Sequence, residues 1–188
     1  MEYTIENTLN RSLGPTSKTS FYAGGYSYDQ AVLNLTGVRS VEMASFSSPL
    51  NVAVGIEARR EGYELFAGEE QSYSFGGALL PNGTPTAPGA QVFPGFRPSN
   101  EVDAHRNAIG AFIDLEANVT PELLASVAVR GERYSDFGNS LAGKLALRYD
   151  FNPNFAVRGA IQNGFRAPSP QQQNFTATST NFINGVPF

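Results

Sequence analysis

The sequence predicts an all-β protein, an antiparallel meander of about seven long strands, on the strength of three observations. Most of the chain falls into segments in which apolar and polar residues alternate with a period of two, as they do along a strand whose faces meet different surroundings. These segments run for about 10–12 residues or more, whereas the average globular strand has about 5–6. No other stretch supplies a helical layer that would cover the apolar side of such a sheet.

The clearest alternating segment is Leu141–Arg166. One face of it would carry Leu141, Gly143, Leu145, Leu147, Tyr149, Phe151, Phe155, Val157, Gly159, Ile161, Asn163 and Phe165. The opposite face would carry the charged residues Lys144, Arg148, Asp150, Arg158 and Arg166. Asn152-Pro153-Asn154 predicts a tight turn between the two halves, because proline presets φ and asparagine tolerates unusual backbone angles. We therefore predict a hairpin with one apolar and one charged face.

The other strands are expected along the rest of the chain, at Met1–Arg11, Gln30–Met43, Leu50–Phe66, Arg106–Val119 and Leu123–Tyr134. Ser12–Asp29 and residues 67–105 are rich in glycine and other turn-forming residues, and both are expected to be loops. Ala108–Val119 also fits a helical period, and Thr120-Pro121 matches a helix start, so a helix is the alternative there. The regular hairpins on both sides favour strands.

Strand length and aromatic placement indicate a lipid environment for the apolar face. A tilted strand needs about 9–11 residues to cross the hydrocarbon of a bilayer. Tyr149, Phe151 and Phe155 would lie at one end of the hairpin and Phe165 at the other, where membrane barrels carry aromatic girdles. Connections at one end of the strands are short and those at the other end are long, as on the two rims of a membrane barrel, with the short Ser135–Asn139 on the long-loop rim as the exception. We predict lipid on the apolar side and water on the charged side.

The composition agrees with a sheet that has lipid on one side and water on the other, and it excludes several other classes of protein. The chain has 188 residues, of which 41% are hydrophobic, and a mean hydropathy of −0.23. No window approaches the about 18–20 apolar residues of a transmembrane helix, which leaves strands as the possible spanning elements. A formal net charge of −4 argues against a nucleic-acid partner. Cysteine is absent, so the chain has no disulfide, thiolate metal site or cysteine nucleophile.

Several short motifs occur in a specific order along the chain. They are Leu50–Glu61 (LNVAVGIEARRE), Gly89–Phe96 (GAQVFPGF), Arg133–Gly138 (RYSDFG), Gly143–Tyr149 (GKLALRY), Arg158–Ala160 (RGA) and Gly164–Pro168 (GFRAP). In this order and spacing they resemble the TonB-dependent outer-membrane receptor family over nearly the whole chain. The last motif, made of Gly164, Phe165, Arg166, Ala167 and Pro168, is expected to act structurally where a strand runs out into a loop.

The resemblance implies that residues 1–188 belong to a 22-stranded transmembrane β-barrel with a plugged lumen. Seven strands cannot close such a barrel and leave a bare edge, so this chain is expected to be an incomplete portion of it. The plug domain, the TonB box and the remaining strands are expected to lie outside this sequence. Met1–Glu6 lacks the features of a signal peptide and Asn184–Pro187 interrupts the alternation, which favours a truncated chain.

The resemblance also implies a function that is not enzymatic. Receptors of this family take up a scarce solute such as a ferric siderophore, cobalamin or an oligosaccharide, with energy from the TonB complex of the inner membrane. The implied location is the outer membrane of a Gram-negative bacterium. The implied partners are outer-membrane lipid, the receptor's own plug domain, TonB acting through that plug, and the transported solute. No cofactor and no metal are expected.

Two groups of candidate site residues follow from this interpretation. The long extracellular-type loop at residues 67–105 is expected to contact the ligand through Tyr73, Phe75, Phe93, Phe96 and Arg97. The plug or the transport path is expected to meet a second group, namely Arg59, Arg106, Asp114, Glu116, Arg130, Arg148 and Arg158. Within this group the two acids are expected to pair with Arg106, Arg130 or Arg148 of neighbouring strands.

Three alternatives remain open at this point. Asp114 and Glu116, two residues apart on one strand face, match the acid and nucleophile of a glycosidase. A soluble all-β carbohydrate-binding module or a glycoside hydrolase fragment would need a second apolar layer, which the sequence does not supply. A passive, porin-like barrel is the third alternative, and a plug domain would exclude it. A catalytic triad is disfavoured, because the single histidine, His105, has no Gly-x-Ser-x-Gly motif to accompany it.

Overall fold

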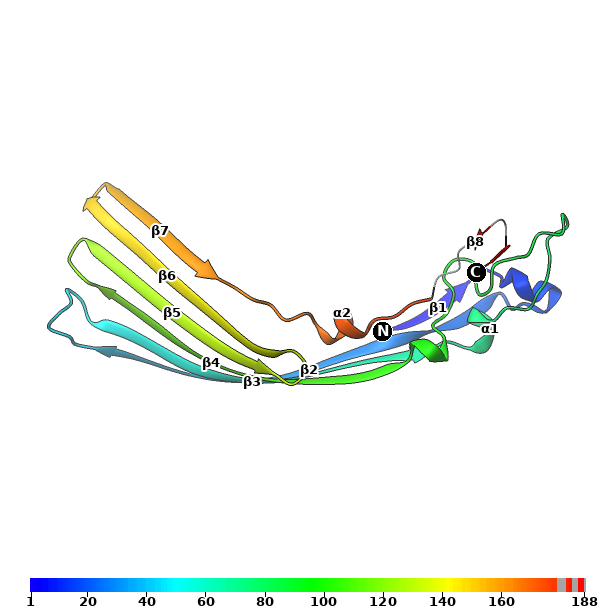
Figure 1. Ribbon diagram of the computed structural model, residues 1–188, viewed down its shortest axis with the longest axis horizontal. Helices are drawn as coiled ribbons and strands as arrows, with labels where there is room; N and C mark the ends of the chain where they lie inside the picture. Colours follow the sequence, from blue (N-terminus) through cyan, green and yellow to red (C-terminus); the bar gives the residue numbers. More distant parts are fainter. Residues whose placement is uncertain (179–181, 184–185, 188) are drawn as a thin grey trace. The chain divides into compact units, whose positions relative to one another are not determined.

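The computed structural model contains one seven-stranded antiparallel sheet in which every strand pairs with its neighbours in the sequence (Figure 1). It describes residues 1–178, 182–183 and 186–187. The strands of the sheet are β1 (Glu2–Glu6), β2 (Ser20–Val41), β3 (Leu50–Ala67), β4 (Val102–Asn118), β5 (Leu123–Tyr134), β6 (Gly138–Asn152) and β7 (Phe155–Asn163). The other elements are short: η1 (Arg11–Thr16), α1 (Glu70–Tyr73), η2 (Pro98–Asn100), α2 (Pro170–Asn174) and the two-stranded ribbon of β8 (Phe182–Ile183) and β9 (Val186–Pro187).

The predicted all-β meander is confirmed, and so is the preference for strands over a helix in residues 108–134. β5 has the predicted boundaries, and β3 extends one residue further than predicted. β4 begins at Val102 instead of Arg106, so the last residues of the expected loop belong to a strand. Among the described residues, no helix is long and apolar enough to cross a membrane.

The prediction of a loop over Ser12–Asp29 is wrong for its second half, because β2 already begins at Ser20. Opposite β1, Thr4 pairs with Tyr22 but Glu2 pairs with Gly25, so β2 carries one extra residue. Gly24 lies in this bulge with a φ of +89°, a backbone conformation that glycine adopts without strain. The glycines that indicated a loop therefore form a bulge inside a long strand.

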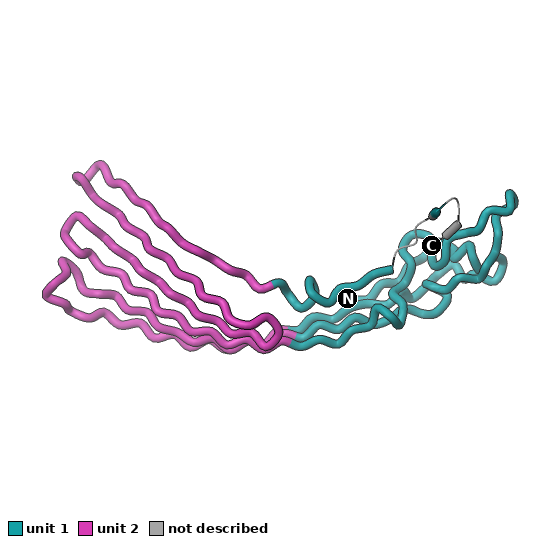
Figure 2. Tube along the Cα trace, in the orientation of Figure 1, with its two compact units in different colours: residues 1–29, 62–105, 168–188 teal, residues 30–61, 106–167 magenta. Residues whose placement is uncertain are grey.

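The chain divides into two compact units (Figure 2). Unit 1 comprises residues 1–29, 62–105 and 168–188, and unit 2 comprises residues 30–61 and 106–167. Unit 1 holds the buried aromatic core, in which Tyr63, Leu65 and Phe96 pack against Tyr3, Tyr26 and Val102. Unit 2 consists of strands and tight turns, and its sheet has two faces of opposite chemistry.

The register of unit 2 fixes which side chains share a face. Leu145 stands opposite Val127 of β5 and Ile161 of β7, whereas Arg148 stands opposite Arg158. Directly paired residues of antiparallel strands point to the same side of the sheet. Val127, Leu145 and Ile161 therefore lie on one side, and Arg148 and Arg158 lie on the other. The exception among the charged residues is Arg133 near the end of β5, which shares the side of Val127.

Candidate functional site

The apolar face of unit 2 is open. Ile161 is 73% exposed and Leu145 is 42% exposed, and Leu147 and Val157 on the same face are also exposed. No described part of unit 2 forms a layer over these side chains. Soluble monomers rarely expose a contiguous apolar surface of this kind, which is typical of a face that contacts lipid or another protein.

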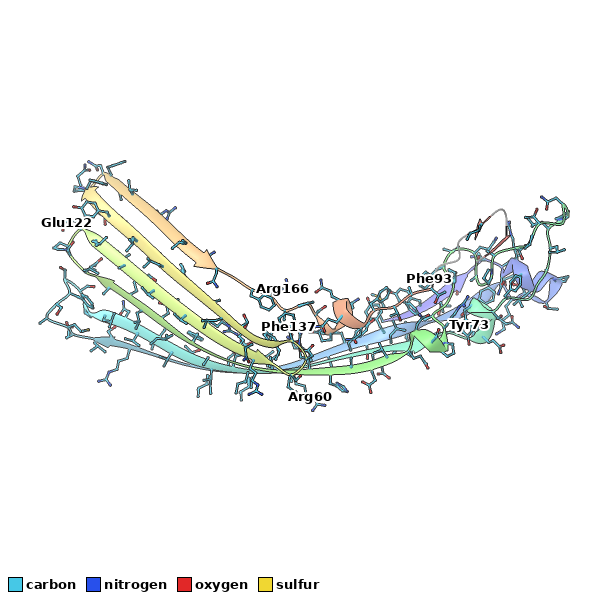
Figure 3. The ribbon with its side chains drawn as sticks, viewed as in Figure 1. Arg60, Tyr73, Phe93, Glu122, Phe137 and Arg166 are labelled. Carbon is cyan, nitrogen blue, oxygen red and sulfur yellow. The ribbon has the colours of Figure 1, made fainter. Side chains whose placement is uncertain are left out.

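Aromatic side chains gather at both ends of this open face. At the β6–β7 turn, the ring of Phe151 lies 4.8 Å from that of Tyr149 and 5.5 Å from that of Phe155. At the other end, Phe137 stacks on Phe165 of the Gly-Phe-Arg-Ala-Pro motif with ring centroids 4.9 Å apart. Figure 3 places Phe137 at the end of unit 2 away from Glu122 of the β4–β5 turn. The wall of a transmembrane barrel has this arrangement, in which an apolar band carries aromatic residues at both of its ends.

The opposite face of unit 2 gathers the whole second group of predicted residues. The registers place Asp114, Glu116, Arg130, Arg148 and Arg158 on this face. Arg59 joins them through an ion pair with Glu132, whose carboxylate lies 3.8 Å from the guanidinium. Arg106 joins them through Tyr134, because its guanidinium carbon lies 5.4 Å from the centre of that ring. The structure thus brings all seven residues to one polar face.

A charge-balanced cluster of Glu57, Arg59, Arg130 and Glu132 occupies the middle of this polar face. Arg130 lies 3.3 Å from Glu57 and 2.7 Å from Glu132, and Arg59 lies 3.2 Å from Glu57. The Tyr134 hydroxyl donates a hydrogen bond of 2.9 Å to Glu132. Two acids and two bases neutralise one another here, so this cluster needs no further charged partner.

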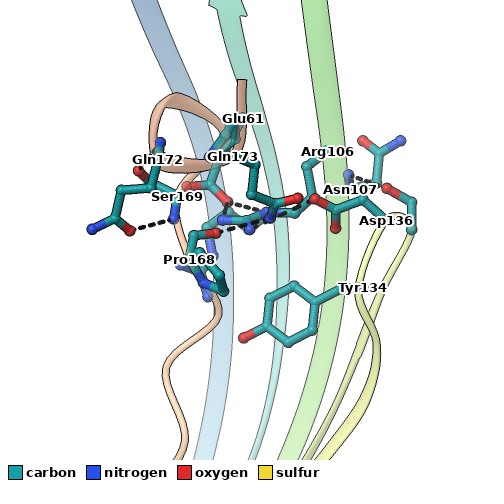
Figure 4. A network of polar contacts seen from close by, with 12 residues as sticks. Glu61, Arg106, Asn107, Tyr134, Asp136, Pro168, Ser169, Gln172 and Gln173 are labelled. Atoms are coloured by element: carbon teal, nitrogen blue, oxygen red, sulfur yellow. Dashed lines mark hydrogen bonds and ion pairs between the residues drawn. The ribbon is translucent and has the colours of Figure 1, made fainter. Parts of the chain in front are cut away.

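Arg106 forms the most deeply buried ion pair of unit 2 (Figure 4). Its Nε and Nη2 atoms donate hydrogen bonds of 2.9 and 2.6 Å to one carboxylate oxygen of Glu61. Asp136 lies 3.8 Å away on the other side of the guanidinium. Arg106 and Glu61 are 3% and 4% exposed, so partners within the protein compensate their charges in place of water.

Three cations, Lys144, Arg148 and Arg158, form what we call the cationic patch. They line a shallow concavity of about 500 Å³ on the polar face, together with Glu116, Ser126 and apolar neighbours. Arg148 donates hydrogen bonds of 3.0 and 2.8 Å to Asp150. In the described part of the chain, Lys144 and Arg158 have no carboxylate within 4.0 Å.

The predicted pairing of Asp114 and Glu116 is wrong. Within the described residues, no basic nitrogen lies within 4.0 Å of either carboxylate. The register gives the reason, since Asp114 stands opposite Ala128 and Glu116 opposite Ser126. The predicted arginines stand in other rows of the sheet, because a strand period of two fixes the face but not the row.

Unit 1 brings together only part of the predicted ligand-binding group. The rings of Phe93 and Phe96 meet edge to face at 5.4 Å, and both lie near Tyr3, at 6.2 and 6.4 Å. Phe93 is 36% exposed, whereas Phe96 is 4% exposed and belongs to the core. Tyr73 ends α1, and Phe75 lies two residues further on with an exposed side chain. The backbone N–H of Arg97 donates to Asn100 and fixes the start of η2.

Sequence reasoning missed the other members of this aromatic cluster, which come from distant segments. They are Tyr3, Tyr26, Tyr63 and Phe175. The Tyr63 hydroxyl is buried without a hydrogen-bond partner among the described residues. Tyr63 and Leu65 lie two residues apart in β3 and therefore share one face of the strand. This alternation was the signal in the sequence that could have predicted their burial on a common face.

The structure offers little support for a catalytic or metal site. His105 lies 3.1 Å from Asp103, and both side chains are more than half exposed. The described residues contain no group of three or more histidine, aspartate or glutamate side chains placed to hold a metal ion. The residues considered for catalysis thus form no enclosed constellation.

A long-stranded antiparallel sheet with one exposed apolar face, aromatic borders and one charged face is built as the wall of a membrane β-barrel. The family model for the β-barrel of TonB dependent receptor-like proteins matches residues 2–187, and the chain belongs to this family. The family comprises outer-membrane receptors and transporters, not enzymes, and the resemblance predicted from the motifs is confirmed. No curated protein and no solved structure matches the chain.

Proposed function

We propose that this chain supplies barrel wall and ligand-capturing loops to a TonB-dependent receptor in the outer membrane of a Gram-negative bacterium. The receptor takes up a scarce solute, of the class of ferric siderophores, cobalamin or oligosaccharides, with energy delivered by TonB through a plug domain. The observation that supports this most is the two-faced sheet of unit 2. Its apolar face contacts outer-membrane lipid, and its polar face borders the plugged lumen.

The distribution of connections supports an orientation in the membrane. Residues 42–49, 119–122 and 153–154 join strands through short turns, whereas residues 68–101 form a long connection at the opposite strand ends. Outer-membrane barrels place short turns on the periplasmic rim and long loops outside. Phe93 then lies on the extracellular side with the rest of the aromatic cluster, where rings are available for ligand contact. Phe96 supports that surface from within the core.

Two adjacent residues provide the test, because they lie on opposite faces of β7. Ile161→Cys and Gln162→Cys are introduced separately into the full-length receptor, in a background without other cysteines. We expect a water-soluble maleimide to label Gln162→Cys and to leave Ile161→Cys unlabelled. A fluorophore on Ile161→Cys should be quenched by brominated lipid. Equal labelling of both variants by the water-soluble reagent would contradict the lipid-facing assignment.

Energy coupling separates this proposal from passive diffusion. We expect uptake by cells that carry the full-length receptor to stop when the proton-motive force is dissipated, because TonB transmits that energy. A porin-like barrel would continue to admit its solute under the same conditions. Uptake that is insensitive to a protonophore would therefore contradict the proposed transport mechanism and leave the membrane assignment intact.

A further inference from the structure

The apolar side of unit 2 carries an arginine near the end of β5. Arg133 lies between Glu132 and Tyr134, whose side chains are joined by a hydrogen bond of 2.9 Å on the polar face. Because successive side chains of a strand point to opposite sides of the sheet, Arg133 points to the apolar side. There it stands opposite Ile109 of β4, which is 60% exposed.

A second arginine, Arg60, reaches the same side from β3, two strands away. It lies between Arg59 and Glu61 in the strand. Arg59 pairs with Glu132 on the polar face, and Glu61 binds Arg106 on that same face. Arg60 therefore points to the apolar side, and it projects below the ribbon in Figure 3. The ion pair between Arg59 and Glu132 also shows that the two apolar-side arginines lie at a similar level along their strands.

Neither apolar-side arginine is neutralised within the chain. Both side chains are exposed, and among the described residues no carboxylate lies within 4.0 Å of either guanidinium. By contrast, Arg59 and Arg130 on the polar face each lie within 4.0 Å of two carboxylates. Acids reach the apolar side of β3 and β4 only further toward the long connection, at Glu64 and Asp103.

The two arginines lie where the apolar band ends. Each lies ten residues beyond the first residue of its strand, because β3 begins at Leu50 and β5 at Leu123. At a rise of about 3.3 Å per residue and a tilt of about 45°, ten residues cover roughly 23 Å of membrane. The apolar band of an outer-membrane barrel is about 25 Å tall. Ile56 and Val129, four residues nearer the turns on the same side, are exposed apolar residues of this band.

We propose that Arg60 and Arg133 form a binding site for the phosphate groups of an anionic lipid in the outer leaflet of the membrane. This inference rests on the proposed function, in which the apolar side contacts lipid and the long connections lie outside. Guanidinium groups bind phosphate through two parallel hydrogen bonds, while their alkyl stems stay on apolar surface. With one strand between them, the two backbones lie roughly 10 Å apart, so each arginine can take its own phosphate group.

The surroundings of the two arginines favour a lipid over a free phosphate ion. Ile109 belongs to the strand between them, and its exposed side chain continues the apolar band up to the level of the arginines. A lipid satisfies both kinds of surface, because its acyl chains cover the apolar residues and its headgroup meets the cations. A free phosphate ion would leave the apolar residues uncovered, and it would meet side chains that are exposed to water.

The test uses the full-length receptor in detergent and counts bound lipids by native mass spectrometry. Phosphatidylglycerol is the anionic probe, and phosphatidylcholine is the comparison, because it carries a phosphate group but no net charge. We expect the parent to prefer phosphatidylglycerol. Arg60→Gln/Arg133→Gln should weaken its binding by about tenfold or more, from the loss of at least one charge-assisted contact. Arg60→Lys/Arg133→Lys should retain part of the binding because it keeps both charges.

Arg11→Gln/Lys18→Gln is the matched control, since it removes two positive charges from the connection between β1 and β2 and should bind phosphatidylglycerol like the parent. An equal loss in the control overturns the inference, because total charge alone would then explain the binding. Unchanged binding in Arg60→Gln/Arg133→Gln also overturns it. Inorganic phosphate that displaces the lipid far more than chloride at equal ionic strength overturns the lipid assignment, because the site would then take the free ion.

The outcomes also separate this inference from the proposed function. Barrel folding is followed by the heat-dependent shift in electrophoretic mobility of the receptor. A folded Arg60→Gln/Arg133→Gln receptor with unchanged lipid binding leaves the barrel assignment intact, whereas labelling of Ile161→Cys by the water-soluble maleimide contradicts the proposed function itself. If the double variant fails to insert, the single variants Arg60→Gln and Arg133→Gln decide, and each should weaken the binding by a smaller factor. Failure of both single variants to insert overturns the inference, because the wall itself would then need these arginines.

Discussion

Unit 1 and unit 2 share the same strand alternation but use their apolar side chains in opposite ways. In unit 1, Phe21, Tyr63 and Leu65 are exposed by 1% or less, and the loop residue Phe96 packs against Tyr63 and Leu65. In unit 2, Leu145 and Ile161 remain open on a face that no described part of the unit covers. Alternation therefore tells which side chains share a face, but the surroundings decide whether protein or lipid contacts that face.

The two polar environments differ in the same way. Unit 2 contains one deeply buried ion pair, a charge-balanced cluster and a cationic patch that follow one another on a single face. Unit 1 pairs its exposed Lys18 with Glu69 at 2.6 Å on the surface. Burial determines how much each ion pair contributes to the free energy of unfolding. Variants of these residues, taken in descending order of expected effect, test that relation.

The largest effect is expected from Arg106→Ala in unit 2. This substitution removes the guanidinium from the buried carboxylate of Glu61, so we expect a loss of about 3–5 kcal/mol in the free energy of unfolding. Urea unfolding of the full-length receptor in detergent measures it. Lys18→Ala is the control, with an expected loss of about 0–1 kcal/mol for an exposed pair. Similar losses for both variants would show that Arg106 is not buried in the assembled receptor.

Phe96→Ala tests the core of unit 1. Truncation of a buried phenylalanine costs about 3–5 kcal/mol, and we expect this loss to appear locally, as faster hydrogen exchange in β3 residues 62–67. Exchange in β6 should not change. Phe75→Ala, at a 55% exposed position, is the matched control. Global acceleration of exchange in both units would show that the two units unfold together.

Leu145→Arg tests the lipid-facing side of unit 2. Arginine on the lipid face near the bilayer midplane costs about 2–4 kcal/mol, so we expect a reduced yield of inserted receptor. Ala146→Arg places an arginine at the next residue of β6, which lies on the polar face of the sheet, and this variant should insert like the parent. The measurement is the fraction of receptor that shows heat-dependent electrophoretic mobility after refolding into lipid vesicles. An equal loss in both variants would contradict the division of the sheet into lipid-facing and water-facing sides.

Glu57→Gln is expected to have the smallest effect. It removes the charge that Arg59 and Arg130 share, but both arginines keep Glu132, so we expect a loss of about 1 kcal/mol in the free energy of unfolding. The same urea experiment measures it, and high salt should reduce the difference from the parent. A loss as large as that of Arg106→Ala would indicate that the cluster is desolvated in the complete barrel.

Particular residues show which features of the structure the sequence predicted and which it did not. The strict alternation of residues 141–151 and 155–163 predicted both faces of the β6–β7 hairpin, because side-chain direction in a strand depends only on parity. The same parity placed Arg59, Arg106, Asp114, Glu116, Arg130, Arg148 and Arg158 on one side. It did not predict the partners of Asp114 and Glu116, because partners depend on the register between strands. It also assigned a loop to Ser20–Asp29, where a single glycine bulge keeps a strand intact.

The sequence by itself determined the all-β class, the family and the two faces of the sheet, since these follow from local alternation and from motifs within single segments. Only the tertiary structure decided which charges neutralise one another, that Phe96 is buried while Phe93 is partly exposed, and that Arg148 opposes Arg158. These features join residues that are distant along the chain. Their energies depend on strand register and on burial, and neither quantity is encoded in a local pattern.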